Sequence, residues 1–146
     1  MSKGNTFETE LLAHVLQNAA LPGIGDAPGL QPSAVAGSLY VALHTANPGE
    51  AGYQTTSEAT YTSYARVAVA RSVGAWTVAA GAAENAALVG FPQCTGGSET
   101  ITHFSVGIDA AGAGKVLYYG ALTASLAVSN GITPEFAAGE LDITED

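Results

Sequence analysis

Short stretches in which apolar and polar residues alternate follow one another from residue 38 to the end of the chain. Such alternation is typical of β-strands, because successive side chains of a strand point to opposite faces of the sheet. Residues that favour turns, mainly Gly, Pro, Asn and Asp, separate the stretches. The pattern predicts strands at 39–44, 64–70, 75–79, 85–91, 101–108, 115–122, 125–129 and 140–144.

This series of strands predicts the fold class. About eight short strands with turn signals between them indicate an antiparallel sandwich or barrel. Eight strands in two sheets make a jelly roll. The glycine-rich segment at 109–114 lies between two predicted strands and is typical of a hairpin loop. We therefore expect an all-β protein, an antiparallel β-sandwich of jelly-roll type with one N-terminal α-helix.

The N-terminal residues follow a helical period instead. Asn5 and Glu8 have the spacing of a capping box, which predicts a helix start. Pro22 and Gly23 end the pattern, so we expect one amphipathic helix at 6–19. Its apolar stripe either packs on the sheet of the same domain or docks on a partner. The residues of the stripe, at helical spacing, are Phe7, Leu11, Leu12, Val15 and Ala19.

Residues 20–37 are rich in Pro, Gly and Ala and show little periodicity, so we expect an extended loop. Loops of this length in compact domains are often functional. The chain has 146 residues, enough to bury a core without disulfides or metals. The expected organisation is an N-terminal helix with an extended arm at 1–37, followed by a β-sandwich domain at 38–146.

The charge balance excludes several kinds of partner. The formal net charge is −9, with only four basic residues. A clustered basic patch for nucleic acid is therefore excluded, and an anionic membrane surface is disfavoured. No apolar run approaches the roughly 20 residues of a membrane span, and the N-terminus lacks the apolar core of a secretion signal. We expect a protein kept in the cytosol unless it leaves within a larger particle. A charged fraction of only 12% suits a chain packed against neighbours.

A metal site lacks a local signature. His14, His44 and His103 lie in separate predicted elements, and neither a His-x-x-x-His nor a Cys-x-x-Cys pair is present. The acidic end at 140–146 alternates carboxylates with apolar residues. This alternation indicates a solvated strand face rather than a calcium loop. We expect no metal and no cofactor.

His44 ends a predicted strand just before Asn47-Pro48-Gly49, where a catalytic group or a structural residue can stand. No Gly-x-Ser-x-Gly nucleophile elbow is present, and no catalytic companion lies in the same motif. A structural or surface-contact role is therefore favoured for His44 and for His103. The single cysteine, Cys94, excludes an internal disulfide, and we interpret it as an inert thiol near a loop.

The segment at 112–115, Gly-Ala-Gly-Lys, departs from the phosphate-binding loop. Asp109 and Val116 occupy the positions where that motif needs Gly and Ser or Thr, and a predicted strand replaces the helix that should follow. We therefore reject a nucleotide-binding interpretation of this segment.

Four stretches, taken in order, carry a resemblance: LYVALHTANPGEAG, YARVAV, ITHFSVGIDAAGAGKVLYYGAL and PEFAAGELDIT. Together they resemble a family of small structural proteins of tailed bacteriophages that are often labelled tail fibre proteins. Within that group the chain is most similar to a capsid cement, or decoration, protein with a jelly-roll fold. The resemblance covers nearly the whole chain and offers no catalytic residues.

The resemblance implies a homodimer on the outer surface of the phage head, assembled in the host cytoplasm. There it would stabilise the shell by bridging subunits of the major capsid protein. One alternative is a tail or tail-fibre component that can bind a receptor. Another is a carbohydrate-binding module or small enzyme, because fold does not decide function. The expected partner contacts are Phe7, Leu11 and Val15 of the helix, Leu30 of the arm, and three tyrosines suited to interfaces, Tyr53, Tyr61 and Tyr64.

Overall fold

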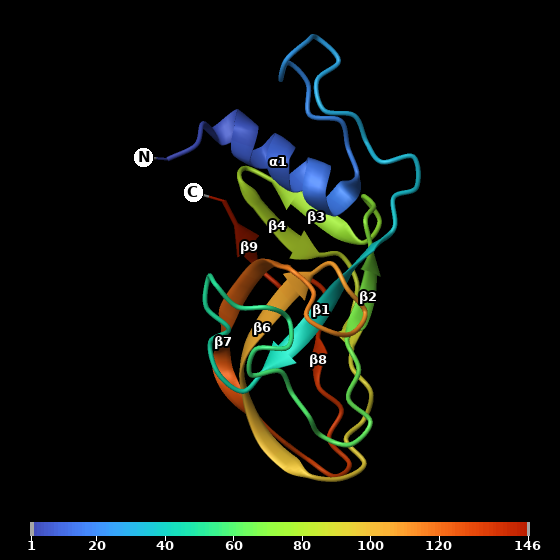
Figure 1. Cartoon of the computed structure of the whole chain (residues 1–146), viewed down its shortest axis with the longest axis vertical. Helices are drawn as coiled ribbons and strands as arrows, with labels where there is room; N and C mark the ends of the chain where they lie inside the picture. Colours follow the sequence, from blue (N-terminus) through green and yellow to red (C-terminus); the bar gives the residue numbers. More distant parts are fainter. Residues whose placement is uncertain (1, 146) are drawn as a thin grey trace. The chain divides into compact units, whose positions relative to one another are not determined.

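The computed structural model describes residues 2–145 and is built mainly of antiparallel strands, with a single helix among those residues. This confirms the prediction of an all-β, sandwich-class fold with one N-terminal helix (Figure 1). The strands form sheets of four, three and two, a division less regular than two equal sheets of a jelly roll. The elements are α1 (Asn5–Gln17), β1 (Ser38–His44), β2 (Val67–Ala70), β3 (Trp76–Ala79), β4 (Ala82–Asn85), β5 (Val89–Gly90), β6 (Ser98–Gly107), β7 (Val116–Ser129), β8 (Glu135–Phe136) and β9 (Ile143–Thr144).

The chain forms two compact units, each assembled from separate stretches of sequence. The first contains Met1–Ser38, Ala70–Val89 and Phe136–Asp146, and the second contains Leu39–Val69 and Gly90–Glu135. The N-terminal helix and arm thus share a unit with later strands. The domain boundary expected after residue 37 stays a prediction.

In the first unit, α1 packs on the three-stranded sheet β3-β4-β9. Leu12 and Leu16 of the helix and Trp76 of β3 are all 0% exposed. The helix therefore packs on a sheet of its own unit, one of the two alternatives left open by its apolar stripe. Leu16, which the stripe omitted, belongs to the buried face, whereas Phe7 is 37% exposed.

The ends of α1 correct two sequence predictions. Gly4 is the N-cap and makes no side-chain hydrogen bond, whereas Asn5 is already helical, so the capping box at Asn5 and Glu8 is wrong. The helix ends at Gln17, before the predicted end, because Asn18 adopts the left-handed conformation at φ 56°. Asn tolerates this conformation and is a common helix C-cap.

Asn85 connects the C-terminal segment to this unit. Its buried amide nitrogen donates to the carbonyls of Ala87 and Ala137, each at a distance of 2.8 Å. Its Oδ1 accepts from the backbone N–H of Leu141. Leu141 and Ile143 are buried at 0% and 5% exposed, and the carboxylates between and beside them are solvated. The predicted alternation of the acidic end is confirmed.

The second unit contains most of the four-stranded sheet β2-β1-β6-β7. Two predicted strands, 115–122 and 125–129, are one strand, β7. Its register against β6 changes from Ile101 opposite Leu126 to His103 opposite Ala121, so the expected break is a β-bulge. The strand predicted at 85–91 is also wrong, because β4 ends at Asn85 and β5 is a separate two-residue strand.

Candidate functional site

His44 lies at the end of β1 and is fully buried. Its Nδ1 is 2.8 Å from the Thr56 carbonyl oxygen, and its Nε2 is 2.7 Å from Ser105 Oγ. A carbonyl only accepts, so Nδ1 carries the proton and Nε2 accepts from the serine hydroxyl. Burial lowers the pKa of His44, partly opposed by the bond to Thr56, so the ring is neutral.

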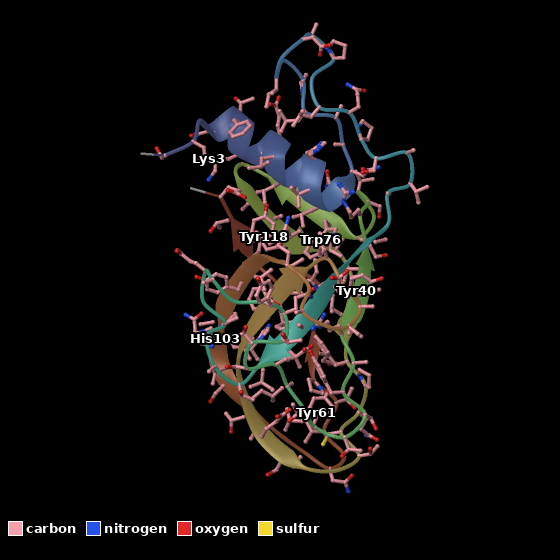
Figure 2. The ribbon with its side chains drawn as sticks, viewed as in Figure 1. Lys3, Tyr40, Tyr61, Trp76, His103 and Tyr118 are labelled. Atoms are coloured by element: carbon pink, nitrogen blue, oxygen red, sulfur yellow. The ribbon has the colours of Figure 1, made fainter. Side chains whose placement is uncertain are left out.

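This pair has the atom types of a nucleophilic dyad but not its access. Ser105 and His44 are both 0% exposed, and the second ring nitrogen faces a backbone carbonyl rather than a carboxylate. A substrate therefore has no path to the serine oxygen in this arrangement. His103, directly opposite His44 on β6, is half-buried, with Nδ1 2.9 Å from the Thr102 hydroxyl (Figure 2).

Arg66 holds the loops that lie around His44 and Ser105. Its side chain is 2% exposed and forms a bidentate ion pair with Glu58, with distances of 2.6 Å from Nε and 2.8 Å from Nη2. It also donates to the carbonyls of Asp109 and Gly112, at 2.9 and 2.7 Å. The bonds to Glu58 raise the pKa of Arg66, which keeps the guanidinium charged. One side chain thus holds the hairpin loop between β6 and β7.

Gln54 is a second buried anchor of the same loop. Its Nε2 donates to the Tyr40 carbonyl at a distance of 3.2 Å, and its Oε1 accepts from the backbone N–H of Asp109 at 3.0 Å. The side chain fits only because glycines stand beside it, since a Cβ added at Gly107 or Gly114 would overlap its atoms. The loop is therefore fixed in one conformation from two sides.

Two of the predicted partner contacts are used inside the second unit. Tyr61 is 4% exposed, donates its hydroxyl to the Pro92 carbonyl over 2.9 Å, and packs edge to face on Tyr64. Tyr64 donates to Glu58 and stacks on Phe91. Burial raises the pKa of Tyr61 to about 12 and also raises that of Tyr64, so both stay neutral. Both rings therefore serve contacts within the second unit.

Tyr53, in contrast, presents an exposed ring. It is 56% exposed and pairs with Lys115, and Ile108 donates its backbone N–H to the Lys115 carbonyl over 3.2 Å. These backbone contacts bring Tyr53, Lys115 and Ile108 side by side. We call Tyr53, Ile108 and Lys115 the Tyr53 row; it sits beside the loop that Arg66 and Gln54 hold.

The helix and arm expose the remaining predicted contacts. Phe7 is 37% exposed, and Leu11 and Val15 are half-buried along the same side of α1. Leu30 is 45% exposed and closes the arm by two backbone hydrogen bonds of 2.9 Å with Leu21. Beyond that closure, the segment 22–29 extends away from α1 (Figure 1).

Arg71 joins the arm to the helix. It donates to the carbonyls of His14 and Val15, each at a distance of 2.6 Å, and to the Ala36 carbonyl at 3.2 Å. A cation at a helix C-terminus satisfies carbonyls that have no partner within the helix. The base of the arm is therefore anchored on α1.

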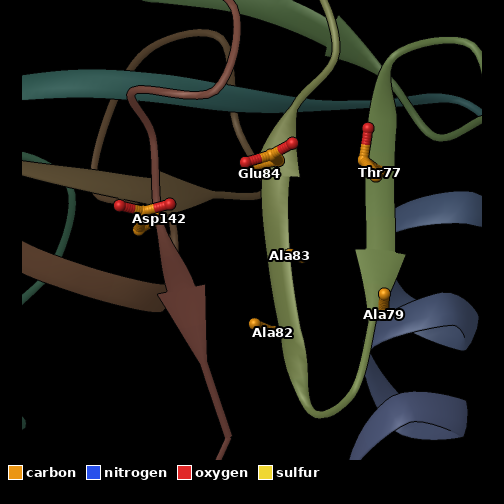
Figure 3. Close-up of a pocket in the computed structure, with 6 residues that line it drawn as sticks. All are labelled: Thr77, Ala79, Ala82, Ala83, Glu84 and Asp142. Carbon is orange, nitrogen blue, oxygen red and sulfur yellow. The ribbon is translucent and has the colours of Figure 1, made fainter.

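The first unit also has a shallow pocket of about 210 Å³ on β3, β4 and the C-terminal segment (Figure 3). Glu84, Asp142 and Thr77 supply its polar atoms, and alanines form the rest of the lining. Within residues 2–145, no group of three or more His, Cys, Asp or Glu is placed to hold a metal ion. Cys94 is buried, and its thiol donates to the Gly96 carbonyl over 3.2 Å.

The buried roles of Arg66 and Gln54 were missed by the sequence analysis. A usable signal was present for Arg66, because it is one of four basic residues and stands inside an otherwise apolar stretch at 64–70. A cation in such a place needs a buried carboxylate partner. Gln54 gave no comparable signal, since its environment is made by Gly107 and Gly114, which are distant in sequence.

A family model described as "Podophage GP4 fiber I protein gp80" matches residues 2–144. No curated protein matches the chain. The matched range includes the helix, the arm and every strand described above. Among the described residues, no helix has the length and apolar character needed to cross a membrane.

Proposed function

Because the chain belongs to the family of the podophage GP4 fiber I protein gp80, we propose that it is a structural component of a phage fibre. The observation that carries this proposal is the family match over residues 2–144. The resemblance to structural proteins of tailed bacteriophages is thereby confirmed at the level of the family. The family is described as a fibre protein, which favours the tail-fibre alternative over the capsid cement role that the resemblance led us to expect.

The surface supports a role in assembly. Only 12% of the residues are charged, and large apolar side chains are exposed on the helix and arm. Exposed apolar groups on a chain with few charged residues suit contact with neighbouring subunits. The residues that we propose for this contact are Phe7, Ile24, Leu30 and Val35 in the first unit and the Tyr53 row in the second.

We also propose that the protein forms a homodimer. In addition, we propose that it has no catalytic activity. The nearest arrangement to a nucleophilic site, Ser105 with His44, is closed, and both ring nitrogens of the histidine are engaged. A hydrolytic role would require turnover that is lost in His44→Ala while the protein remains folded. Any such turnover would contradict the proposal.

Capsid cement is the second candidate. It is favoured by the resemblance of the chain to a capsid cement, or decoration, protein within the phage structural family, and its partner would be the major capsid protein. It differs from the fibre proposal in location and copy number, because a shell component covers a large repeated surface.

Quantitative mass spectrometry of purified virions, with immunogold labelling, separates the two candidates. A fibre component is expected at a small fraction of the major capsid protein, with label at the tail. A copy number near that of the capsid protein, with label over the head, would replace the fibre proposal by the cement role. Absence from virions would contradict both.

A further inference from the structure

Strand β7 ends in an Asn-Gly turn on the surface of the second unit. The backbone N–H of Ile132 donates to the Ser129 carbonyl at 3.0 Å, which closes a turn with Asn130 and Gly131 at its centre. Both central residues are exposed. Gly131 adopts a φ of 91°, which glycine takes without strain at this position of a turn. Water therefore reaches the side-chain amide of Asn130.

An Asn-Gly pair contains the reacting groups for a spontaneous modification, deamidation. The backbone nitrogen of Gly131 attacks Cγ of Asn130, a nitrogen–carbon bond forms, and a succinimide ring results. The bond from Cγ to Nδ2 breaks, and ammonia leaves with the proton that the backbone nitrogen has lost. Water then opens the ring at either carbonyl, so the product is aspartate or isoaspartate. Glycine favours the attack because it has no side chain to crowd the nitrogen.

Only one of the five asparagines of the chain is followed by glycine. Asn47 precedes Pro48, whose backbone nitrogen has no proton to lose. Asn5, Asn18 and Asn85 are followed by threonine or alanine, whose side chains crowd the attacking nitrogen. The chemistry therefore concentrates at the turn after β7.

The fold holds the attacking nitrogen in place. The backbone N–H of Gly131 donates to the Cys94 carbonyl at 2.8 Å, and the N–H of Cys94 donates to the Ile132 carbonyl at 2.8 Å. Gln93 Nε2 also donates to the Gly131 carbonyl at 2.9 Å. An amide nitrogen must give up its proton to attack, and here the Cys94 carbonyl holds that proton. The reaction therefore requires these hydrogen bonds to open locally.

The segment that supplies the Cys94 carbonyl is itself fixed. Cys94 is 0% exposed, and its thiol donates to the Gly96 carbonyl. On the next residues, the N–H of Thr95 donates to the Thr62 carbonyl at 3.1 Å, and the N–H of Thr62 donates to the Gly96 carbonyl at 2.9 Å. The Asn-Gly turn is thus bonded to an anchored segment rather than to a loose loop.

We propose that Asn130 is a latent deamidation site, which is reactive by sequence and protected as long as Gly131 stays bonded to Cys94. The product would place a carboxylate in the stretch 116–134, which has no charged residue. Isoaspartate would also lengthen the backbone at the turn by one methylene group, so the bonds of Gly131 and Ile132 to Cys94 could not both re-form. The turn would then convert a transient opening into a permanent change. This inference is independent of the fibre and cement candidates.

The rate of deamidation and the rate of amide exchange at Gly131 test the proposal together on the full, unmodified chain. Mass spectrometry of the proteolytic fragment that contains residues 130–131 follows deamidation in a mildly alkaline buffer. NMR follows exchange of the Gly131 N–H in the same buffer, and a synthetic peptide of residues 126–135 serves as the unstructured reference. The folded chain should deamidate at least about tenfold more slowly than the peptide, and this suppression should match the protection of the Gly131 amide within about threefold.

A variant beside the turn provides the second test. Gln93→Ala removes the bond to the Gly131 carbonyl and should raise both exchange and deamidation by about two- to tenfold. Gln31→Ala is the matched control, because this exposed glutamine donates to the Pro28 carbonyl in the arm. It should leave both rates unchanged, and circular dichroism confirms that each variant is folded.

Several results would overturn the proposal. Deamidation of the folded chain as fast as that of the peptide would show that the turn gives no protection. A peptide that does not deamidate would show that the site is not reactive. Suppression that does not follow exchange at Gly131, or faster exchange in Gln93→Ala without faster deamidation, would show that the bond to Cys94 is not the cause.

Discussion

Arg66 and Glu58 form a two-point ion pair in which the arginine side chain is 2% exposed. The remaining donors of the same guanidinium hold the carbonyls of Asp109 and Gly112. Only arginine supplies this planar set of donors with a permanent charge. The pair therefore sets the conformation of the hairpin loop between β6 and β7, beside the Tyr53 row.

Arg66→Ala should lower the free energy of unfolding by about 3–5 kcal/mol, because it leaves Glu58 without its partner. Arg66→Lys keeps the charge but cannot make the paired bonds and reach both carbonyls, so it should also destabilise. Urea denaturation measures both variants. Lys115→Ala, which removes an exposed cation, is the control and should change stability by less than about 0.5 kcal/mol. If Arg66→Ala and the control Lys115→Ala lowered stability equally, the structural role assigned to Arg66 would be contradicted.

The stability of the protein should fall on mild acidification because of His44. Its pKa in the folded chain lies below the ordinary value of 6.5, mainly through burial. The unfolded chain therefore takes up the proton first, and the stability contributed by neutral His44 is lost as the pH falls from about 6.5 toward the folded pKa. Denaturation curves across this range should show a smaller pH slope in His44→Gln. An unchanged slope would show that His44 does not contribute to it.

Gly107→Ala should destabilise the second unit through overlap with Gln54. The new Cβ would lie 2.6 Å from Gln54 Cγ, and Gln54 is fully buried and cannot move aside freely. We expect a loss of about 1–3 kcal/mol. Gly74→Ala is the control, since its Cβ would meet only Ser72 Oγ at 3.9 Å. If Gln54→Ala and Gly107→Ala have strictly additive effects in the double variant, the overlap is not the cause.

Leu16→Ala should destabilise the first unit by about 2–5 kcal/mol, because it removes a fully buried side chain between α1 and its sheet. Phe7→Ala should cost much less, since Phe7 is 37% exposed. Chemical denaturation measures both. A larger loss for Phe7→Ala would mean that the stripe of Phe7, Leu11 and Val15, rather than Leu12 and Leu16, carries the packing of the helix.

The arm can be shortened without disturbing its base. Leu21 and Leu30 already make both backbone hydrogen bonds of a closed pair, so an Asn-Gly turn can replace residues 22–29. The shortened protein should keep its melting temperature and its dimer but be incorporated poorly into virions. Complementation of a phage that lacks the gene, followed by counting of the incorporated protein, measures this effect. Normal incorporation would exclude the arm tip as an attachment site.

Much of the fold could be predicted from local patterns. Alternation identified the strand that ends at His44 and the buried side of the acidic C-terminal segment, and the apolar stripe identified α1. These features depend on periodicity, which is a local property of the chain. The helix boundaries were less accurate, because Gly4 and Asn18 cap α1 through backbone conformation, which the residue types only favour.

The sequence by itself determined the class of the fold, the acidic surface, the lack of local catalytic or metal motifs and the resemblance to phage structural proteins. Only the tertiary structure decided that Tyr61 and Tyr64 are internal while Tyr53 is exposed, and that Ser105 reaches His44. It also decided that Val116–Ser129 is one bulged strand at a sheet edge. The physical reason is that burial, ion pairing and strand neighbours depend on residues far apart in the chain, and no local period records which of them meet.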